Sequence, residues 1–281
     1  MKIAIIALVC ALGAFAAGET LEEFGYDWDN IKPAILVKEP IGPIPEIPQS
    51  GSRIIGGSVA ARGAFPYQAA LIINGNSFCG GSIISNQWVL TAAHCVDTAT
   101  SVQLILGAHN PRTTVNEPTQ VRLASDGRVV HADWNRNTLQ YDIALLRAAG
   151  IPVGAAGISA VALAPASSGT FAGSTAVLSG WGRTSDLSNS IADELNTVQL
   201  QILSNAVCQN TFGSSIADQH ICTSGSGRVG ACNGDSGGPL VVNGVEVGVV
   251  SFGSVLCSVG LPTAYARVSY FRNWITSNSG V

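Results

Sequence analysis

Short apolar runs separated by turn-forming residues are the feature that most limits the folds open to this chain. Clusters of Gly, Asn, Ser and Pro stand between the runs, and Asn74-Gly75 and Asn243-Gly244 are typical of hairpin turns. The chain lacks the regular alternation of strands and long helices that a parallel α/β sheet requires. An all-β sandwich or barrel is therefore expected, with strands at 67–73, 81–84, 88–90, 102–106, 121–123, 143–146, 175–178, 197–202, 239–242 and 245–250.

The length of 281 residues allows one large β domain or two ordinary ones. Helical spacing in residues 270–275 predicts a helix that closes the fold. The formal net charge is −4, so the chain has no basic excess of the kind that marks a nucleic-acid-binding surface. Nucleic acid is therefore not an expected partner.

The first residues have the form of a secretory signal peptide. Lys2 precedes an apolar run over 3–15, and the small residues Ala16-Ala17-Gly18 follow it. The run is too short for a membrane span, and no later segment is long and apolar enough to be one. We expect residues 1–18 to be removed near Gly18 and the product to be secreted and extracellular, without a membrane partner.

The cysteines indicate disulfide bonds. Cys10 leaves with the signal, and an even set in an oxidising compartment remains. A zinc site is the alternative, but it would want Cys-x-x-Cys pairs with further ligands, which the sequence lacks. No metal and no cofactor are expected. The six remaining cysteines are Cys79, Cys95, Cys208, Cys222, Cys232 and Cys257.

Residues 19–53 differ in composition from the rest of the chain. They are rich in proline and in acidic residues, and such a segment has little to bury, so it is interpreted as an extended leader. It ends in small residues followed by Arg53, where an exposed loop would be cut by a protease with basic specificity. Cleavage would make Ile54 a new N-terminus; the alternative is an ordinary linker entering a strand. The expected division is an activation propeptide over 19–53 and a catalytic domain over 54–281.

Ser236 lies in the glycine-rich stretch 232–239. Glycines allow a sharp turn, and a serine on that turn can be exposed as a nucleophile while backbone N–H groups face a developing oxyanion. The stretch also satisfies the Gly-x-Ser-x-Gly pattern of α/β-hydrolases, and an ordinary turn is a third interpretation.

His94 and Asp142 are the candidate partners of this serine. His94 follows an apolar strand and two small alanines and precedes Cys95, which could anchor the turn. General-base chemistry needs such a rigidly held imidazole, since its pKa is near neutrality. Asp142 leads directly into an aliphatic run, where burial would be costly unless the carboxylate is paired. A strand cap is the structural alternative for Asp142.

Three motifs in this order resemble those of chymotrypsin-like serine proteases. They are Thr91-Ala92-Ala93-His94-Cys95, Asp142-Ile143-Ala144-Leu145-Leu146 and Gly234-Asp235-Ser236-Gly237-Gly238-Pro239. Their order is His, Asp, Ser, whereas α/β-hydrolases have Ser, Asp or Glu, His. The resemblance extends from Ile54 to about Ile275. It implies two six-stranded antiparallel Greek-key barrels with the active site between them and a C-terminal helix.

The resemblance also implies the catalytic roles. Ser236 would be the nucleophile and His94 the general acid and base, with Asp142 orienting the imidazole. The backbone N–H groups of Gly234 and Ser236 would form the oxyanion hole. Cleavage after Arg53 would free the α-amino group of Ile54 to pair with buried Asp235, which would order the oxyanion hole and the specificity pocket. The implied disulfides are Cys79–Cys95, Cys208–Cys222 and Cys232–Cys257.

Five residues would set substrate choice in a protease of this family. Gly230 would form the pocket floor, where trypsin-like members carry aspartate. Ser251-Phe252-Gly253 would pair with the substrate backbone, with Gly253 leaving the pocket open, and Thr263 would shorten its wall. An uncharged pocket favours Leu, Met, Phe, Tyr and smaller residues at P1, the residue whose carbonyl is attacked.

Within the family the chain is most similar to the arthropod brachyurin group, on Ile54-Ile55-Gly56-Gly57 and Phe65-Pro66-Tyr67-Gln68. Crustacean members have an acid at the position of Thr263, so its absence weakens the case for their broad specificity and for collagen cleavage. A digestive role is favoured over a dedicated venom or immune protease and over a non-catalytic binding homologue. The expected partners are protein and peptide substrates, an activating trypsin-like protease and protein inhibitors, and a monomer is expected.

Overall fold

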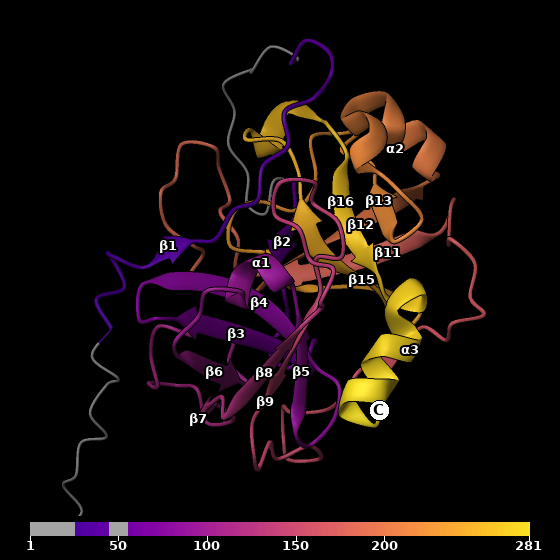
Figure 1. Ribbon diagram of the computed structural model, residues 1–281. Coiled ribbons are helices and arrows are strands. Elements are labelled where there is room, and N and C mark those ends of the chain that lie inside the picture. Colours follow the sequence, from indigo (N-terminus) through magenta and orange to yellow (C-terminus); the bar gives the residue numbers. More distant parts are fainter. Residues whose placement is uncertain (1–25, 45–55) are drawn as a thin grey trace, which may run out of the picture.

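The computed structural model describes residues 26–44 and 56–281 (Figure 1). The expected signal peptide, and Arg53 and Ile54 at the expected activation site, lie outside the described residues. Among the described residues, no helix is long and apolar enough to cross a membrane.

The N-terminal half of the domain forms one curled sheet in the order β7-β6-β3-β4-β5-β9-β8. Its central strand β3 is buried along its whole length, and β3 and β4 meet at a hairpin where Asn74 and Gly75 both have positive φ. Only Ser125 and Asp126 separate β7 from β8, so this bent segment brings the two edges together. The strands are β3 (Gln68–Ile73), β4 (Ser77–Ile83), β5 (Trp88–Thr91), β6 (Val102–Leu106), β7 (Val121–Ala124), β8 (Gly127–Val130) and β9 (Ala144–Arg147).

The C-terminal half forms a closed barrel. The sheet order is β10-β15-β14-β11-β12-β13-β16, and an additional pairing of β15 with β16 closes the ring. The short strand β2 (Ser58–Val59) pairs with β12. The strands are β10 (Ala162–Leu163), β11 (Thr175–Gly180), β12 (Asn196–Leu203), β13 (His220–Thr223), β14 (Pro239–Val242), β15 (Val245–Phe252) and β16 (Thr263–Arg267).

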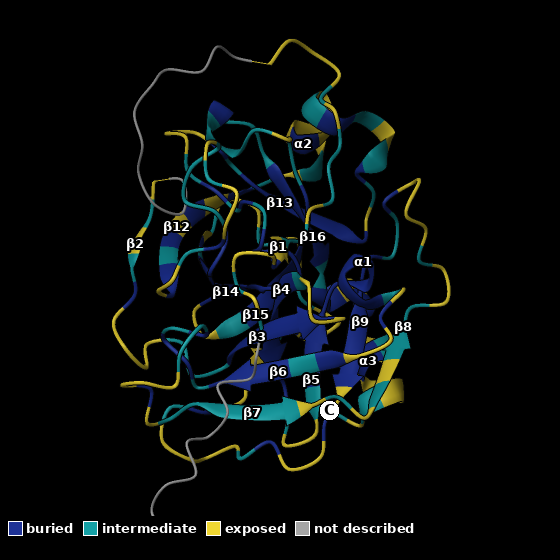
Figure 2. Cartoon of the chain, turned by 90° about the vertical axis from the view of Figure 1, so that its left-hand side faces the viewer, coloured by how far each residue is buried: buried dark blue, intermediate teal, exposed yellow. Residues whose placement is uncertain are grey.

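The predicted all-β architecture is confirmed, with one difference in detail. The second sheet closes by strand pairing, whereas the first curls through its bent β7–β8 segment without a direct pairing of its end strands. Two short pairings, β1 with β4 and β10 with β15, are parallel in an otherwise antiparallel fold. Figure 2 shows the buried interiors of both sheets.

Short helices complete the domain. The C-terminal helix α3 is confirmed and longer than the predicted 270–275; Phe271 and Ile275 are buried in the core, and Gly280 ends the helix with φ 75°. The catalytic candidate His94 lies in the single turn α1. The helices are α1 (Ala93–Val96), α2 (Asn205–Phe212), η1 (Gly213–Ser215), η2 (Cys257–Val259) and α3 (Val268–Ser279).

The leader departs from the expectation that it has little to bury. It is extended, but its short strand β1 (Lys32–Pro33) pairs with β4, and Ile31 is only 2% exposed. Ile31 joins a cluster that includes Phe78 and Trp181. The composition misled because a few apolar residues, among them Ile31 and Leu36, and a few strand hydrogen bonds suffice to hold an extended segment.

Candidate active site

His94 and Asp142 meet in the buried space between the two sheets. His94 Nδ1 lies 2.7 Å from Asp142 Oδ2, and the backbone N–H of His94 donates to Asp142 Oδ1 at 2.8 Å. The two side chains are 1% and 0% exposed. Asp142 therefore fixes both the ring and the backbone of His94, and the strand-cap interpretation of Asp142 is insufficient.

Asp142 has a third donor that the sequence did not reveal. The hydroxyl of Ser251 donates to Asp142 Oδ2 at 2.6 Å. Burial alone would raise the pKa of Asp142, but the charge of His94 and the hydrogen bonds from His94 and Ser251 lower it below its usual value. Asp142 thus stays ionised beside the imidazole. Ser251, expected as a pocket residue, also stabilises this carboxylate.

Ser236 lies on a tight turn that only glycine neighbours permit. Gly234 and Gly237 have φ of 97° and 79°. A Cβ on Gly237 would lie 2.2 Å from Thr91 Oγ1 and 2.6 Å from the Gly80 carbonyl oxygen. The backbone N–H of Gly80 also donates to the Ser236 carbonyl at 2.8 Å. The turn is therefore pressed against strands β4 and β5, beside His94.

Asp235 points away from the cleft into a pocket of backbone donors. It is 1% exposed, and it accepts from Gly182 N–H at 2.8 Å and from Cys232 N–H at 3.0 Å. Burial raises the pKa of Asp235 to about 6, although both hydrogen bonds oppose the rise. Within the described residues, no cation pairs with this carboxylate.

One of the two expected oxyanion donors, together with the hydroxyl of Ser236, faces the leader. The backbone N–H of Gly234 donates to the carbonyl oxygen of Ala34 at 3.1 Å, and the hydroxyl of Ser236 lies 3.4 Å from the same oxygen. The described part of the chain records no hydrogen bond between Ser236 and His94. Ala34, absent from every sequence-based expectation, thus occupies the place where a substrate carbonyl would react.

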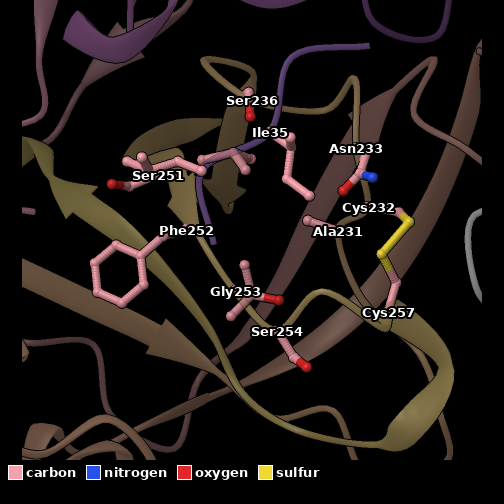
Figure 3. A pocket seen from close by; sticks show the side chains of 13 residues that line it. Ile35, Ala231, Cys232, Asn233, Ser236, Ser251, Phe252, Gly253, Ser254 and Cys257 are labelled. Atoms are coloured by element: carbon pink, nitrogen blue, oxygen red, sulfur yellow. A yellow bond between two sulfur atoms is a disulfide. The ribbon is translucent and has the colours of Figure 1, made fainter. Parts of the chain in front are cut away.

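A pocket opens beside Ser236 (Figure 3). Phe252 lines it only through its backbone, because its ring turns away to pack against Phe212 and His220. Gly230 does not line it directly, but a Cβ there would lie 3.5 Å from Thr263 Oγ1. None of the described residues lining it is charged: Ile35, Leu36, Ala231, Cys232, Asn233, Ser236, Val250, Ser251, Phe252, Gly253, Ser254, Cys257 and Thr263.

All six cysteines expected in the mature chain are paired as the resemblance implies, as Cys79–Cys95, Cys208–Cys222 and Cys232–Cys257. The first bridge holds the turn of His94, and the third joins the Ser236 loop to the pocket wall. Two groupings within the described chain bring three potential metal ligands together, and each contains two of these bonded cysteines. Their sulfurs are therefore not available as thiolates.

The remaining histidines have other surroundings. His220 is buried, and its Nδ1 accepts from the Ala217 N–H at 3.1 Å while Nε2 lies 3.1 Å from the Leu139 carbonyl. Burial lowers the pKa of His220, so it is a neutral structural residue. His131 stacks on Tyr141, and burial lowers its pKa as well.

Comparison with known proteins supplies the family. The profile described as Trypsin matches residues 54–275. The chain belongs to the trypsin family. It is 43% identical over 230 residues to brachyurin of Leptuca pugilator, covering 81% of this chain and 99% of brachyurin. It is 37% identical to trypsin delta of Drosophila melanogaster, covering 85% of this chain and 94% of that protein.

A solved structure of HL collagenase has the same fold as this trypsin-family chain. The TM-score is 0.72 at 33% sequence identity, and the match covers 81% of this chain and 99% of the collagenase chain. The family and these relatives identify the protein as a chymotrypsin-like serine endopeptidase. The predicted similarity to the brachyurin group is confirmed.

Sequence reasoning missed the contribution of the leader to this trypsin-family site. The signal was present as the short apolar run Ala34-Ile35-Leu36-Val37, which prolines bracket at positions 33 and 40. A proline-bracketed apolar run favours an extended peptide with side chains to bury. It could not be assigned to the cleft, because nothing in the run indicates what it contacts.

Proposed function

We propose that this protein is a secreted serine endopeptidase, made as a zymogen that cleavage after Arg53 activates. It prefers uncharged hydrophobic or aromatic P1 residues and has a digestive role. The observation that carries the proposal is the buried His94–Asp142 pair beside Ser236, at the rim of an uncharged pocket. The signal-like sequence of residues 1–18 supports secretion.

In the proposed mechanism Ser236 Oγ attacks the substrate carbonyl carbon while His94 takes the hydroxyl proton. The N–H groups of Gly234 and Ser236 stabilise the oxyanion of the tetrahedral intermediate. His94 then gives its proton to the amine that leaves, which forms the acyl-enzyme. Water, deprotonated by His94, releases the acid product and restores Ser236. Asp142 stabilises the imidazolium in both halves of the cycle.

Activation would work through Asp235. Its carboxylate lies buried on two backbone N–H groups, and burial holds its pKa at about 6. A new ammonium group at Ile54 would pair with this charge and lower that pKa, because an opposite charge favours the ionised form. The pairing would stabilise the turn that carries Ser236 and the oxyanion donors.

Pocket chemistry supports the proposed specificity. Gly230, expected at the floor, carries no charge, and Thr263, 3.5 Å from a Cβ placed on Gly230, is 7% exposed. A buried lysine or arginine side chain would find no carboxylate among the described lining residues. Brachyurin and a collagenase are relatives, but Thr263 at this position disfavours extending their substrates to this protein.

The test is to express the full chain, cleave it after Arg53 and assay it against chromogenic peptides that vary only at P1. Leu, Met, Phe or Tyr should be cleaved fastest. A fluorophosphonate should label the cleaved and well-diluted protein at Ser236, since Ala34 must leave the site first, with Ser236→Ala as the unlabelled control. The specificity proposal would be wrong if Arg or Lys substrates were cleaved fastest. Absence of labelling would contradict the catalytic proposal.

A further inference from the structure

The leader runs from the N-terminal sheet, where β1 pairs with β4, to Gly253 at the end of β15 in the C-terminal sheet (Figure 1). At its start, Lys32 N–H donates to the Asn76 carbonyl and Ala34 N–H donates to the Phe78 carbonyl, both at 2.8 Å. Beyond the catalytic serine, Lys38 N–H donates to the Gly253 carbonyl at 3.0 Å. The leader therefore uses backbone groups on both sides of Ser236, as a bound peptide would.

The leader lies in the wrong direction for cleavage. In a substrate, the residue whose side chain enters the pocket also places its own carbonyl in the oxyanion hole. Here the carbonyl facing Gly234 N–H belongs to Ala34, whereas the leader residues lining the pocket are the next two, Ile35 and Leu36. The pocket thus holds residues on the amine side of the Ala34–Ile35 bond. Attack on that bond would form an acyl-enzyme at Ala34 with no residue of the acyl side in the pocket.

Strand pairing gives the same direction independently. The bridge between Val37 and Gly253 is parallel, and so is the pairing of β1 with β4. Residues before the Ala34–Ile35 bond pair with β4, and residues after it pair with Gly253. In a cleavable peptide, the residues before the scissile bond pair with the pocket edge at Gly253. The leader places the residues after the bond there, so it binds in the reverse direction.

The leader also engages the nucleophile. The hydroxyl of Ser236 lies 3.4 Å from the Ala34 carbonyl oxygen and, within the described residues, makes no hydrogen bond to His94. Proton transfer from Ser236 to the imidazole requires that hydrogen bond. The bound leader therefore blocks the cleft, and its Ala34 carbonyl competes with His94 for the Ser236 hydroxyl.

Side-chain anchors lie at both ends of this segment. Ile31 is 2% exposed in the cluster with Phe78 and Trp181, and Leu36 packs against the cluster that contains Phe252. Ile41, farther along, is 70% exposed although its N–H donates to the Thr211 carbonyl at 2.9 Å. Binding therefore depends on Ile31 much more than on Ile41.

We propose that residues 26–44 are a tethered peptide inhibitor, which binds the catalytic cleft in the reverse direction and resists cleavage there. The proposal rests on the proposed zymogen function. It adds that cleavage after Arg53 is insufficient for full activity, because the leader remains bound until it dissociates. Residues 19–53 contain no cysteine, so only non-covalent contacts would hold the leader after that cleavage.

The experiment compares the full chain with its Ile31→Asp and Ile41→Asp variants, each cleaved after Arg53. The specific activity of the wild type and of Ile41→Asp should rise at least about 10-fold on serial dilution, as the leader dissociates. Ile31→Asp should be fully active at every concentration, because a buried carboxylate expels the leader. Full wild-type activity at every concentration would overturn the proposal.

A synthetic peptide of residues 26–44, labelled with fluorescein, separates this proposal from the catalytic one. Its anisotropy should report binding to the cleaved Ile31→Asp protein, whose own leader is expelled, even if that protein proved inactive. The Ile31→Asp peptide should bind at least about 10-fold more weakly than the Ile41→Asp peptide. Mass spectrometry should find the Ala34–Ile35 and Ile35–Leu36 bonds intact. Equal binding of the two variant peptides, or cleavage of either bond at the rate of a substrate, would refute the reverse-bound inhibitor.

Discussion

At the scale of single residues, Asp142 shows how a buried charge is retained. It accepts hydrogen bonds from the His94 backbone and from Ser251, and it pairs with the His94 ring. These contacts offset the cost of burial and keep the pKa of the carboxyl low. The same contacts hold the imidazole in one tautomer and one orientation.

Replacement of Asp142 by asparagine should reduce kcat by about 10⁴-fold, because an amide neither stabilises the imidazolium nor selects the reactive tautomer. The measurement is kcat for a good P1 peptide at pH 8. Ser251→Ala should reduce kcat less, since it removes one hydrogen-bond donor to Asp142 and leaves the carboxylate. A loss below 10-fold in Asp142→Asn would exclude this role.

The burial of Glu246 leads to a second prediction, on how the stability of the protein depends on pH. It is fully buried, and burial raises its pKa from 4.5 to about 8 although Ser82 donates to Oε2 at 2.6 Å. Its Oε1 has no partner among the described residues. Because the folded-state pKa is raised, the stabilisation from the bound proton is complete below pH 4.5 and is lost as the pH rises through 8.

Chemical denaturation at pH 5 and pH 9 tests this prediction. The wild type should lose on the order of 5 kcal/mol of unfolding free energy through Glu246 over this range. Glu246→Gln should lose correspondingly less, and substitution of the exposed Asp218 by asparagine should behave as the wild type. Identical pH dependence in Glu246→Gln and the wild type would contradict the assigned titration.

At the scale of elements, the turn that carries Ser236 lies between β13 and β14 in the chain and is held against β4 and β5 by close backbone approach. Gly237→Ala should destabilise it, since the new Cβ would lie 2.2 Å from Thr91 Oγ1. Gly244→Ala in the β14–β15 hairpin is the matched control, because φ is nearly the same there, 80° against 79°, and nothing lies within 4 Å of its Cβ.

The control should lose about 1–2 kcal/mol of stability from its left-handed backbone alone. Gly237→Ala should lose several kcal/mol in denaturant unfolding and most of its peptidase activity, because backbone must move as well. Equal stability of the two variants would show that the contact with Thr91 relaxes without cost.

At the scale of the whole molecule, the proposed activation depends on one distant pairing, between Ile54 and Asp235. Asp235 is buried with only backbone donors around it among the described residues, and its raised pKa shows that its charge is poorly compensated. A cationic N-terminus at residue 54 would supply the missing charge and would couple chain cleavage to the order of the active site.

Ile54→Gly, with cleavage after Arg53 kept, should leave a weak enzyme, because glycine cannot bury the side chain that holds the new N-terminus in place. The measurement is kcat/KM of the variant after N-terminal sequencing has shown complete cleavage. The protein is assayed well diluted, so that the leader has dissociated. A loss of kcat/KM then reports the missing Ile54 side chain and not inhibition by the leader. Full activity in this variant would remove Asp235 from the proposed switch.

The sequence by itself determined the fold class, the family and the residues that meet in the site. Strands and turns were predictable because short apolar runs and turn chemistry are local properties of the sequence. His94, Asp142 and Ser236 were recognisable because each lies in a short motif that resembles one of the three triad motifs of chymotrypsin-like proteases. The absence of charged side chains from the pocket was also predictable from the identities of the residues alone.

The tertiary structure alone decided features that depend on contacts between distant segments. Ser251 donates to Asp142 although 109 positions separate them, and the Phe252 ring faces away from the pocket that its backbone lines. The leader looked like a segment with nothing to bury until Ile31 was found among Phe78 and Trp181. Its direction across the cleft was invisible in the sequence, because an apolar extended peptide can pair with a strand edge in either direction.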